Sequence, residues 1–118
     1  MTSKIPAYLV ASSYMAEDHG SLYPYGEAVH PLMEKWGGEL LIAGETGQFM
    51  EHYEGEWKHN ARFTLFKFPS MEHLQGFWKS DEYQVIKHLR TDVIPPNFTF
   101  AVEGFDKNKW EAQNINKE

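Results

Sequence analysis

The sequence has no cysteine, few basic residues and no long hydrophobic run. Without cysteine, disulfides, thiolate catalysis, iron–sulfur ligation and cysteine-based zinc sites are excluded, which fits the reducing cytoplasm where we expect this protein. Eleven basic residues against seventeen acidic ones give a formal charge of -6, the wrong sign for a phosphate backbone, so we expect no nucleic-acid partner. No segment approaches a signal peptide or a membrane span, and we expect no membrane association.

Motifs for bound cofactors and metals are also missing. The stretch from Gly44 to Gly47 offers only Gly-x-x-Gly, which falls short of a phosphate-binding loop or a dinucleotide fingerprint. Several His and Glu residues gather in predicted turns and an irregular arm, but their spacing matches no metal-binding pattern and is more typical of a solvated acidic loop. These residues are His19, Glu51, His52, Glu54, Glu56 and His59. We therefore expect no cofactor and no metal.

Aromatic residues, by contrast, are abundant: eight Phe, six Tyr and four Trp make up 15% of 118 residues. A chain of this length forms one domain with one core. Aromatic side chains each bring a large apolar surface, and the compact core of one small domain does not obviously need so many. We therefore expect part of this aromatic surface to lie outside the single compact core.

Hydrophobic periodicity predicts the order strand, helix, strand, strand, helix, strand. Ser70 opens the second helix, which has a short continuation from Asp81, and two glycines after Trp36 end the first helix. Strands are expected at 7–14, 39–45, 61–68 and 97–103, and the first helix at 21–36. Residues 46–60 suit an extended arm or a hairpin. We place the domain at residues 1–105, followed by a loosely held polar tail at 106–118.

This order is that of the split β-α-β, ferredoxin-like fold, an α+β protomer with a βαββαβ topology and a four-stranded antiparallel sheet. Both helices then cover one face of the sheet. Several strands nevertheless carry apolar groups on both faces; in the third strand Phe63 and Leu65 alternate with Phe66 and Phe68. A sheet face exposed to water should be polar. We therefore expect a homodimer that packs two sheets face to face as a dimeric α+β barrel.

The chain also resembles a known family through short motifs in a fixed order. They are Gly37-Gly38, Glu54-Gly55-Glu56-Trp57, Arg62, Phe68-Pro69-Ser70, Phe77-Trp78, Ser80, Glu82-Tyr83-Gln84, Arg90 and Glu103-Gly104. Over about Ala7 to Phe105 this pattern resembles a bacterial domain-of-unknown-function family in the dimeric α+β barrel superfamily. The resemblance implies a dimeric barrel with a pocket between each sheet and its helices. Because members of the superfamily run many different reactions, it implies only a small organic ligand.

Three residues are candidates for catalysis. Arg62 begins the third strand and can hold a ligand carboxylate or phenolate in a bidentate manner, with a salt bridge to an acidic residue as the alternative. The Tyr83 hydroxyl can orient a substrate or donate a proton within an aromatic pocket. His30 precedes Pro31, whose place inside the helix predicts a kink or local widening beside the imidazole. The alternative for His30 is a solvated surface position.

Four further residues are candidates for binding the substrate: Tyr14, Glu54, Trp57 and Trp78. Next to Gly55, which allows close backbone approach, Trp57 would cap the barrel with Glu54 at its mouth; a bulge at the sheet edge is the alternative. Trp78 belongs either to the pocket wall or to the core. Tyr14 shares a strand face that lines either the pocket or the dimer seam.

The leading functional hypothesis is a cofactor-independent enzyme of the isomerase, cyclase or monooxygenase type. It would act on an aromatic or polyketide-like metabolite in the pocket between sheet and helices. A non-catalytic ligand-binding or stress-associated dimer is the alternative, because it would use the same pocket without turnover. A third hypothesis is an interaction module whose bare sheet face binds a different protein.

Overall fold

The computed structural model describes residues 5–14, 22–45, 47–58 and 60–115 of the chain. Its elements follow the predicted order, with short helices added after the second helix and at the C-terminal end. They are β1 (Ala7–Tyr14), α1 (Tyr23–Trp36), β2 (Glu39–Ile42), β3 (Ala61–Phe68), α2 (Met71–Lys79), α3 (Asp81–Gln84), α4 (His88–Thr91), β4 (Pro96–Glu103) and α5 (Lys107–Ile115). Ser21, the first residue of the helix predicted at 21–36, lies outside the described residues.

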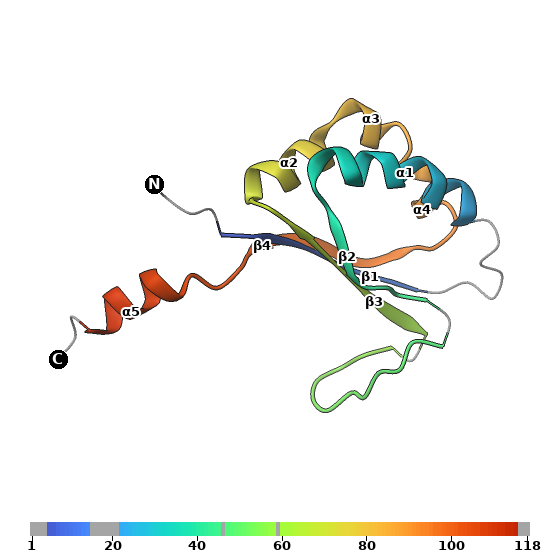
Figure 1. The fold of residues 1–118 in the computed structure, drawn as a ribbon. Helices are drawn as coiled ribbons and strands as arrows, with labels where there is room; N and C mark the ends of the chain where they lie inside the picture. Colours follow the sequence, from blue (N-terminus) through green and yellow to red (C-terminus); the bar gives the residue numbers. More distant parts are fainter. Residues whose placement is uncertain (1–4, 15–21, 46, 59, 116–118) are drawn as a thin grey trace.

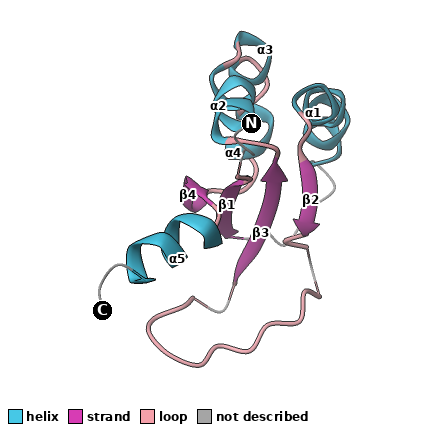
Figure 2. Ribbon diagram, turned by 60° about the vertical axis from the view of Figure 1, so that its left-hand side comes forward, coloured by secondary structure: helices cyan, strands magenta, loops and turns pink. Residues whose placement is uncertain are grey.

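The four strands form one antiparallel sheet in the order β2-β3-β1-β4, which confirms the predicted α+β class and four-stranded sheet. α1, α2, α3 and α4 lie on one side of this sheet, and the arm between β2 and β3 hangs on the other (Figure 1). The view in Figure 2 shows the same two layers, with α1 to α4 at the top and the arm below. β4 is an edge strand, so Pro96 can begin it without breaking a ladder hydrogen bond.

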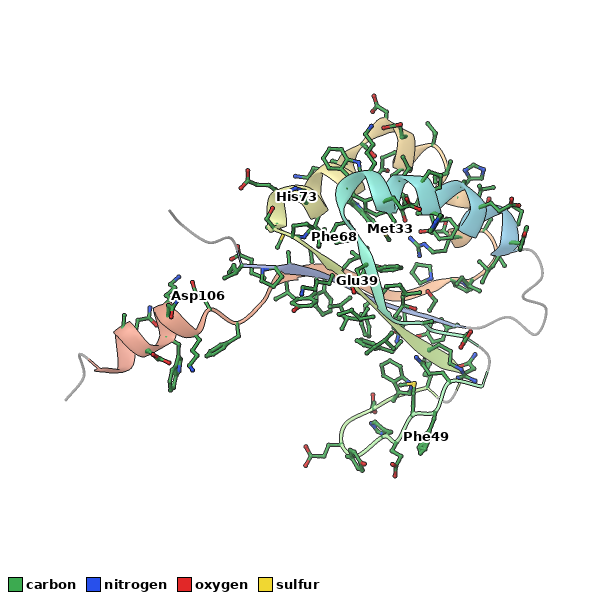
Figure 3. The ribbon with its side chains drawn as sticks, in the orientation of Figure 1. Met33, Glu39, Phe49, Phe68, His73 and Asp106 are labelled. Atoms are coloured by element: carbon green, nitrogen blue, oxygen red, sulfur yellow. The ribbon has the colours of Figure 1, made fainter. Side chains whose placement is uncertain are left out.

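The core lies between the sheet and the helices, around aromatic rings that are almost fully buried. Phe68 of β3 and Phe77 of α2 are both 0% exposed, and their ring centroids are 5.4 Å apart. Met33 of α1 packs in the same cluster, and Figure 3 labels Met33 and Phe68 between the two layers. Each such side chain contributes about 1.5–3 kcal/mol through its removal from water.

Glycines set where α1 ends and how closely α2 approaches it. Gly37 has a φ of 75°, a left-handed conformation that ends α1, and the N–H of Gly38 donates to the Met33 carbonyl at 2.7 Å. A Cβ on Gly76 of α2 would lie 2.3 Å from the Trp36 ring. Trp36 therefore lies directly on the α2 backbone, and only glycine leaves room for it.

The sheet face opposite the helices is apolar, and we call its six residues the open face. They are Val10, Phe63, Leu65, Phe98, Phe100 and Val102, which the strand register places on one side. Phe100 is 49% exposed and Val102 is 45% exposed. The predicted placement of apolar residues on both faces of the sheet is thus confirmed.

Residues 43–60 form an extended arm with no helix or strand among its described residues, so the arm, not a hairpin, is what the structure contains. Gln48 fixes its start: its amide side chain donates to the Phe63 carbonyl at 2.8 Å and accepts from the Phe63 N–H at 3.0 Å. This side chain takes the place of a strand partner. β2 consequently ends at Ile42, three residues earlier than the predicted strand.

The tail forms a helix, α5, where the sequence predicts a loosely held segment. The Asp106 carboxylate accepts a hydrogen bond from the Lys109 N–H at 3.1 Å and so caps the first turn. Lys107 and Glu111 add an exposed ion pair at 3.6 Å. Phe105 and Trp110 contact each other with centroids 6.1 Å apart, and α5 projects away from the sheet and its helices (Figure 1).

Candidate functional site

The described residues line a partly open cavity of about 270 Å³ between the sheet and the helices, which we call the helix-side cavity. Alternate residues of β1 and β3 form its floor, and all of the helices from α1 to α4 contribute to its walls. It is lined by Leu9, Ala11, Ser13, Leu22, Tyr25, Gly26, Gly44, Arg62, Thr64, Phe66, Trp78, Tyr83, Arg90, Ile94 and Thr99. Such a mostly apolar wall with a few convergent polar groups is typical of small-molecule sites.

Tyr83 is the centre of the aromatic wall and is only 1% exposed. Its ring lies 4.6 Å from that of Phe77 and 5.0 Å from that of Trp78, measured between centroids. The local reason for this position is a helix cap: Ser80 accepts a hydrogen bond from the Tyr83 N–H at 3.1 Å and starts α3. This cap turns the chain so that the Tyr83 ring points into the core and the cavity.

A buried tyrosine hydroxyl needs hydrogen-bond partners, and Tyr83 has two. Its oxygen lies 3.1 Å from the Tyr25 hydroxyl of α1 and accepts from Arg90 Nη2 of α4 at 3.4 Å. Arg90 also lies over the Tyr25 ring, with its guanidinium carbon 5.8 Å from the centroid. Three elements far apart in sequence thus meet in one hydrogen-bonded cluster, Tyr25–Tyr83–Arg90, in the cavity wall.

The protonation of Tyr25 follows from this environment. Burial raises the pKa of Tyr25 well above its ordinary value of 10.0, and the neighbouring Tyr83 raises it further, while Arg90 acts in the opposite direction. Tyr25 is therefore a neutral hydroxyl at physiological pH. Arg90 is permanently charged and can only donate hydrogen bonds. The cluster consequently offers donors and a positive charge to whatever occupies the cavity.

The structure brings three of the predicted site residues, Arg62, Trp78 and Tyr83, together in the helix-side cavity. Arg62 lies on the cavity side of β3, and its Nη1 donates to the neighbouring Ala61 carbonyl at 3.0 Å. Arg90 and Tyr25 join them, although sequence reasoning did not single either out. The signals were present: Arg90 belongs to the motif pattern, and Tyr25 is a polar-tipped residue in the apolar stripe of the first helix.

The other predicted site residues lie outside this cavity. The His30 side chain is 75% exposed on α1 and lies 2.6 Å from the Glu34 carboxylate, measured from Nε2. Tyr14 points to the opposite side of the sheet from Ser13, and its hydroxyl donates to Asn97 at 2.8 Å. The physical reason is the alternation of side chains along β1.

Trp57 and Glu54 belong to the arm, not to the cavity wall. The Trp57 ring packs edge-on against Phe98 of the open face, with centroids 6.2 Å apart. Glu54 is exposed. Gly55 between them has a φ of 79°, so the arm does turn sharply at this motif. The motif Glu54-Gly55-Glu56-Trp57 therefore belongs to the arm, and its Trp57 lies beside the open face.

The described residues contain no group of three or more His, Asp or Glu side chains placed to hold a metal ion. His19 and His59 fall outside those residues. None of the helices in the described part of the chain combines the length and apolar character needed to cross a membrane.

Comparison with known proteins identifies the family and supports the fold. The model of a family described as "Domain of unknown function (DUF1330)" matches residues 6–105. The structure of RPA0582, a protein of unknown function from Rhodopseudomonas palustris, matches with a TM-score of 0.61 and 12% identity, covering 87% of this chain and 85% of that one. The methylated RPA0582 protein matches with a TM-score of 0.60 and 14% identity, covering 88% and 84%. No curated protein matches the sequence.

Proposed function

The chain belongs to the DUF1330 family, and we propose that it is a homodimeric, cofactor-independent enzyme of small aromatic metabolites. The ligand occupies the helix-side cavity. The observation that carries this proposal is the Tyr25–Tyr83–Arg90 cluster in an otherwise largely apolar wall. A purely structural core has no need for a guanidinium and two hydroxyls beside an unfilled space, because buried polar groups are stabilising only when they are fully partnered.

The chemistry that suits this wall is isomerisation or cyclisation at a carbonyl. As a neighbouring C–H bond is broken, its proton passes to solvent water, negative charge develops on the carbonyl oxygen, and preorganised donors stabilise that charge. The two arginine guanidinium groups and two tyrosine hydroxyls of the wall are donors of this kind. The described residues of the wall include no carboxylate and no histidine, so their contribution is to the oxygen of the substrate. The apolar remainder of the wall orients the ring.

A second copy of the chain is the simplest cover for the open face. The helices protect only one side of the sheet, while Phe100 and Val102 of β4 and Ile42 of β2 are 49%, 45% and 38% exposed. Antiparallel sheets that face water alternate apolar and polar residues, and contiguous apolar patches mark interaction sites. Two open faces packed about a two-fold axis would bury these groups.

The enzyme proposal is tested by turnover of phenolic and cyclic carbonyl compounds by the full chain and by Tyr83→Phe. This variant keeps the ring in place and removes one hydroxyl, so kcat should fall by about 10²-fold, as for loss of one preorganised donor. Arg62→Ala should also lower turnover. Tyr23→Phe is the matched control, because Tyr23 is 71% exposed and lies outside the cavity wall. Its turnover should equal that of the parent.

Two outcomes would contradict the proposal. Full activity of both Tyr83→Phe and Arg62→Ala on a substrate that the parent turns over would remove the catalytic role of the cavity. Saturable binding of these compounds with no turnover of any of them would leave the chain a ligand-binding protein.

A further inference from the structure

The charges of the chain are distributed unevenly around the helix-side cavity. The sequence has eleven basic residues, of which only Arg62 and Arg90 are arginines, and both line this cavity. No lysine, aspartate or glutamate is among its described lining residues. A chain with a formal charge of -6 thus places both of its arginines at one internal space. Arginine is the side chain that best matches the planar geometry of a carboxylate.

Arg90 has no countercharge among the described residues. None of the ion pairs found there includes it, and its polar contacts are with Tyr83 and Tyr25, both of which are neutral groups. Its Nη1 atom is buried without a hydrogen bond. A partly buried guanidinium is normally paired with an anion, because removing a charge from water is costly. An anionic ligand would provide the missing partner.

A proton count points the same way. The Tyr25 and Tyr83 hydroxyls carry two protons, and the hydrogen bond between them uses one. Arg90 has no acceptor atom, so it cannot take the second proton. Whichever tyrosine donates to the other, one O–H beside Arg90 remains available to a ligand. The cluster therefore offers a ligand a free donor beside a positive charge, which suits a carboxylate because it has two acceptor oxygens.

The size of the cavity limits what carries that carboxylate. About 270 Å³ corresponds to roughly nine water molecules at about 30 Å³ each. A single ring with one or two small substituents fits within such a space. Phe66 and Trp78 provide flat apolar surfaces for the ring, and Leu9 and Ile94 complete the apolar wall.

From these observations we infer that the ligand of the helix-side cavity is a single-ring organic acid whose carboxylate contacts Arg90 and the free tyrosine O–H. This inference rests on the proposed function, since it assumes that the cavity is the ligand site, and it adds a negative charge to the description of the ligand. Arg62 adds positive charge to the same space.

The test compares acids with amides of the same shape. Calorimetric titration at neutral pH of the full chain with benzoate, salicylate and trans-cinnamate is set against titration with benzamide, salicylamide and cinnamamide. The acid should bind at least about tenfold more tightly than its amide, because hydrogen bonds to a charged group are about twice as strong as neutral ones. Arg90→Gln should remove this preference and leave amide binding within about twofold.

Three further variants separate charge from folding. Lys87→Gln is the matched control: it removes a positive charge three residues from Arg90, at a residue outside the cavity lining, and should leave acid binding within about twofold. Arg90→Lys keeps the positive charge and should retain part of the preference for acids over amides. It therefore tests the role of the charge even where Arg90→Gln folds poorly. Tyr25→Phe keeps the ring and should weaken acid binding by about threefold to tenfold.

The outcomes distinguish this inference from the proposed function. If amides bind as tightly as acids, or if Arg90→Gln leaves the acid preference unchanged, the anionic ligand is wrong while the cavity remains a ligand site. If neither acids nor amides bind saturably, the ligand site itself is wrong.

Discussion

At the scale of single residues, Tyr25 and Tyr83 each serve the core and the cavity. Tyr83 is 1% exposed and contacts three other aromatic rings, so its ring contributes to packing as much as any phenylalanine would. Its hydroxyl, however, is part of the Tyr25–Tyr83–Arg90 cluster. Replacing tyrosine by phenylalanine therefore separates the two roles, because only the hydroxyl is lost.

The raised pKa of Tyr25 predicts how stability depends on alkaline pH. The unfolded chain loses this proton near pH 10.0, whereas the folded chain keeps it to higher pH. The stabilising effect is thus complete below pH 10.0 and is lost as pH rises further. Through this group, the free energy of unfolding should fall by at most about 1.4 kcal/mol per pH unit above pH 10.0.

Urea unfolding between about pH 9 and about pH 11 measures this slope in the parent and in Tyr25→Phe. The variant should show a shallower fall than the parent. Tyr23→Phe, at an exposed position of the same helix, should keep the parent slope. Equal slopes in the parent and Tyr25→Phe would contradict the assigned environment of Tyr25.

Sequence reasoning reached only part of the candidate site. Arg62, Trp78 and Tyr83 were identifiable because few basic residues and a recurring motif drew attention to them. The role of Arg90 and Tyr25 is harder to predict, because it depends on contacts among α1, α3 and α4, which are far apart in the sequence. His30 lies on the exposed surface of α1, the alternative that the sequence leaves open, and Tyr14 lies on the face of β1 opposite the cavity.

At the scale of elements, two helical glycines have opposite surroundings. A Cβ on Gly26 of α1 would meet nothing within 4 Å, whereas a Cβ on Gly76 of α2 would meet the Trp36 ring at 2.3 Å. Gly76 is therefore needed for the contact between α1 and α2. Gly26 is not needed for packing, and it lies at the cavity lining, where the absence of a side chain keeps space open.

These surroundings predict opposite effects of the same substitution. Gly26→Ala should raise the free energy of unfolding by roughly 0.5–1 kcal/mol, because alanine restricts the unfolded chain and favours a helix. Gly76→Ala brings the same helical preference but forces Trp36 to move. This substitution should therefore lower the free energy of unfolding by about 1–3 kcal/mol. Thermal or urea unfolding of the pair measures both. Stabilisation by Gly76→Ala would contradict the packing of Trp36 on α2.

The elements that sequence reasoning placed well are those whose periodicity is long and clear. β1, β3 and α1 lie within two residues of their predicted bounds. β2 is shorter because the Gln48 side chain forms hydrogen bonds with the backbone N–H and carbonyl of Phe63, where a longer β2 would pair. Hydrophobic periodicity does not indicate such a contact. α5 was missed because its residues are mostly polar; its cap, Asp106, was the available signal.

At the scale of the whole molecule, most of the aromatic residues fall into three groups. One group fills the core around Phe68 and Phe77, a second lines the helix-side cavity, and a third lies on the open face and the arm. Phe49 and Tyr53 of the arm are 74% and 82% exposed, and Figure 3 labels Phe49 on the side of the sheet away from the helices. A single copy leaves this third group in water.

Native mass spectrometry of the intact protein tests the central claim, a dimer with one ligand cavity in each chain. The account predicts the mass of two chains at micromolar concentration and, with the tightest acid of the panel added, further peaks one and two ligand masses higher. Phe100→Glu, which places a charge on the open face, should shift the spectrum to single chains. Single chains in the parent would contradict the dimer, and saturation at one ligand per two chains would contradict a cavity in each.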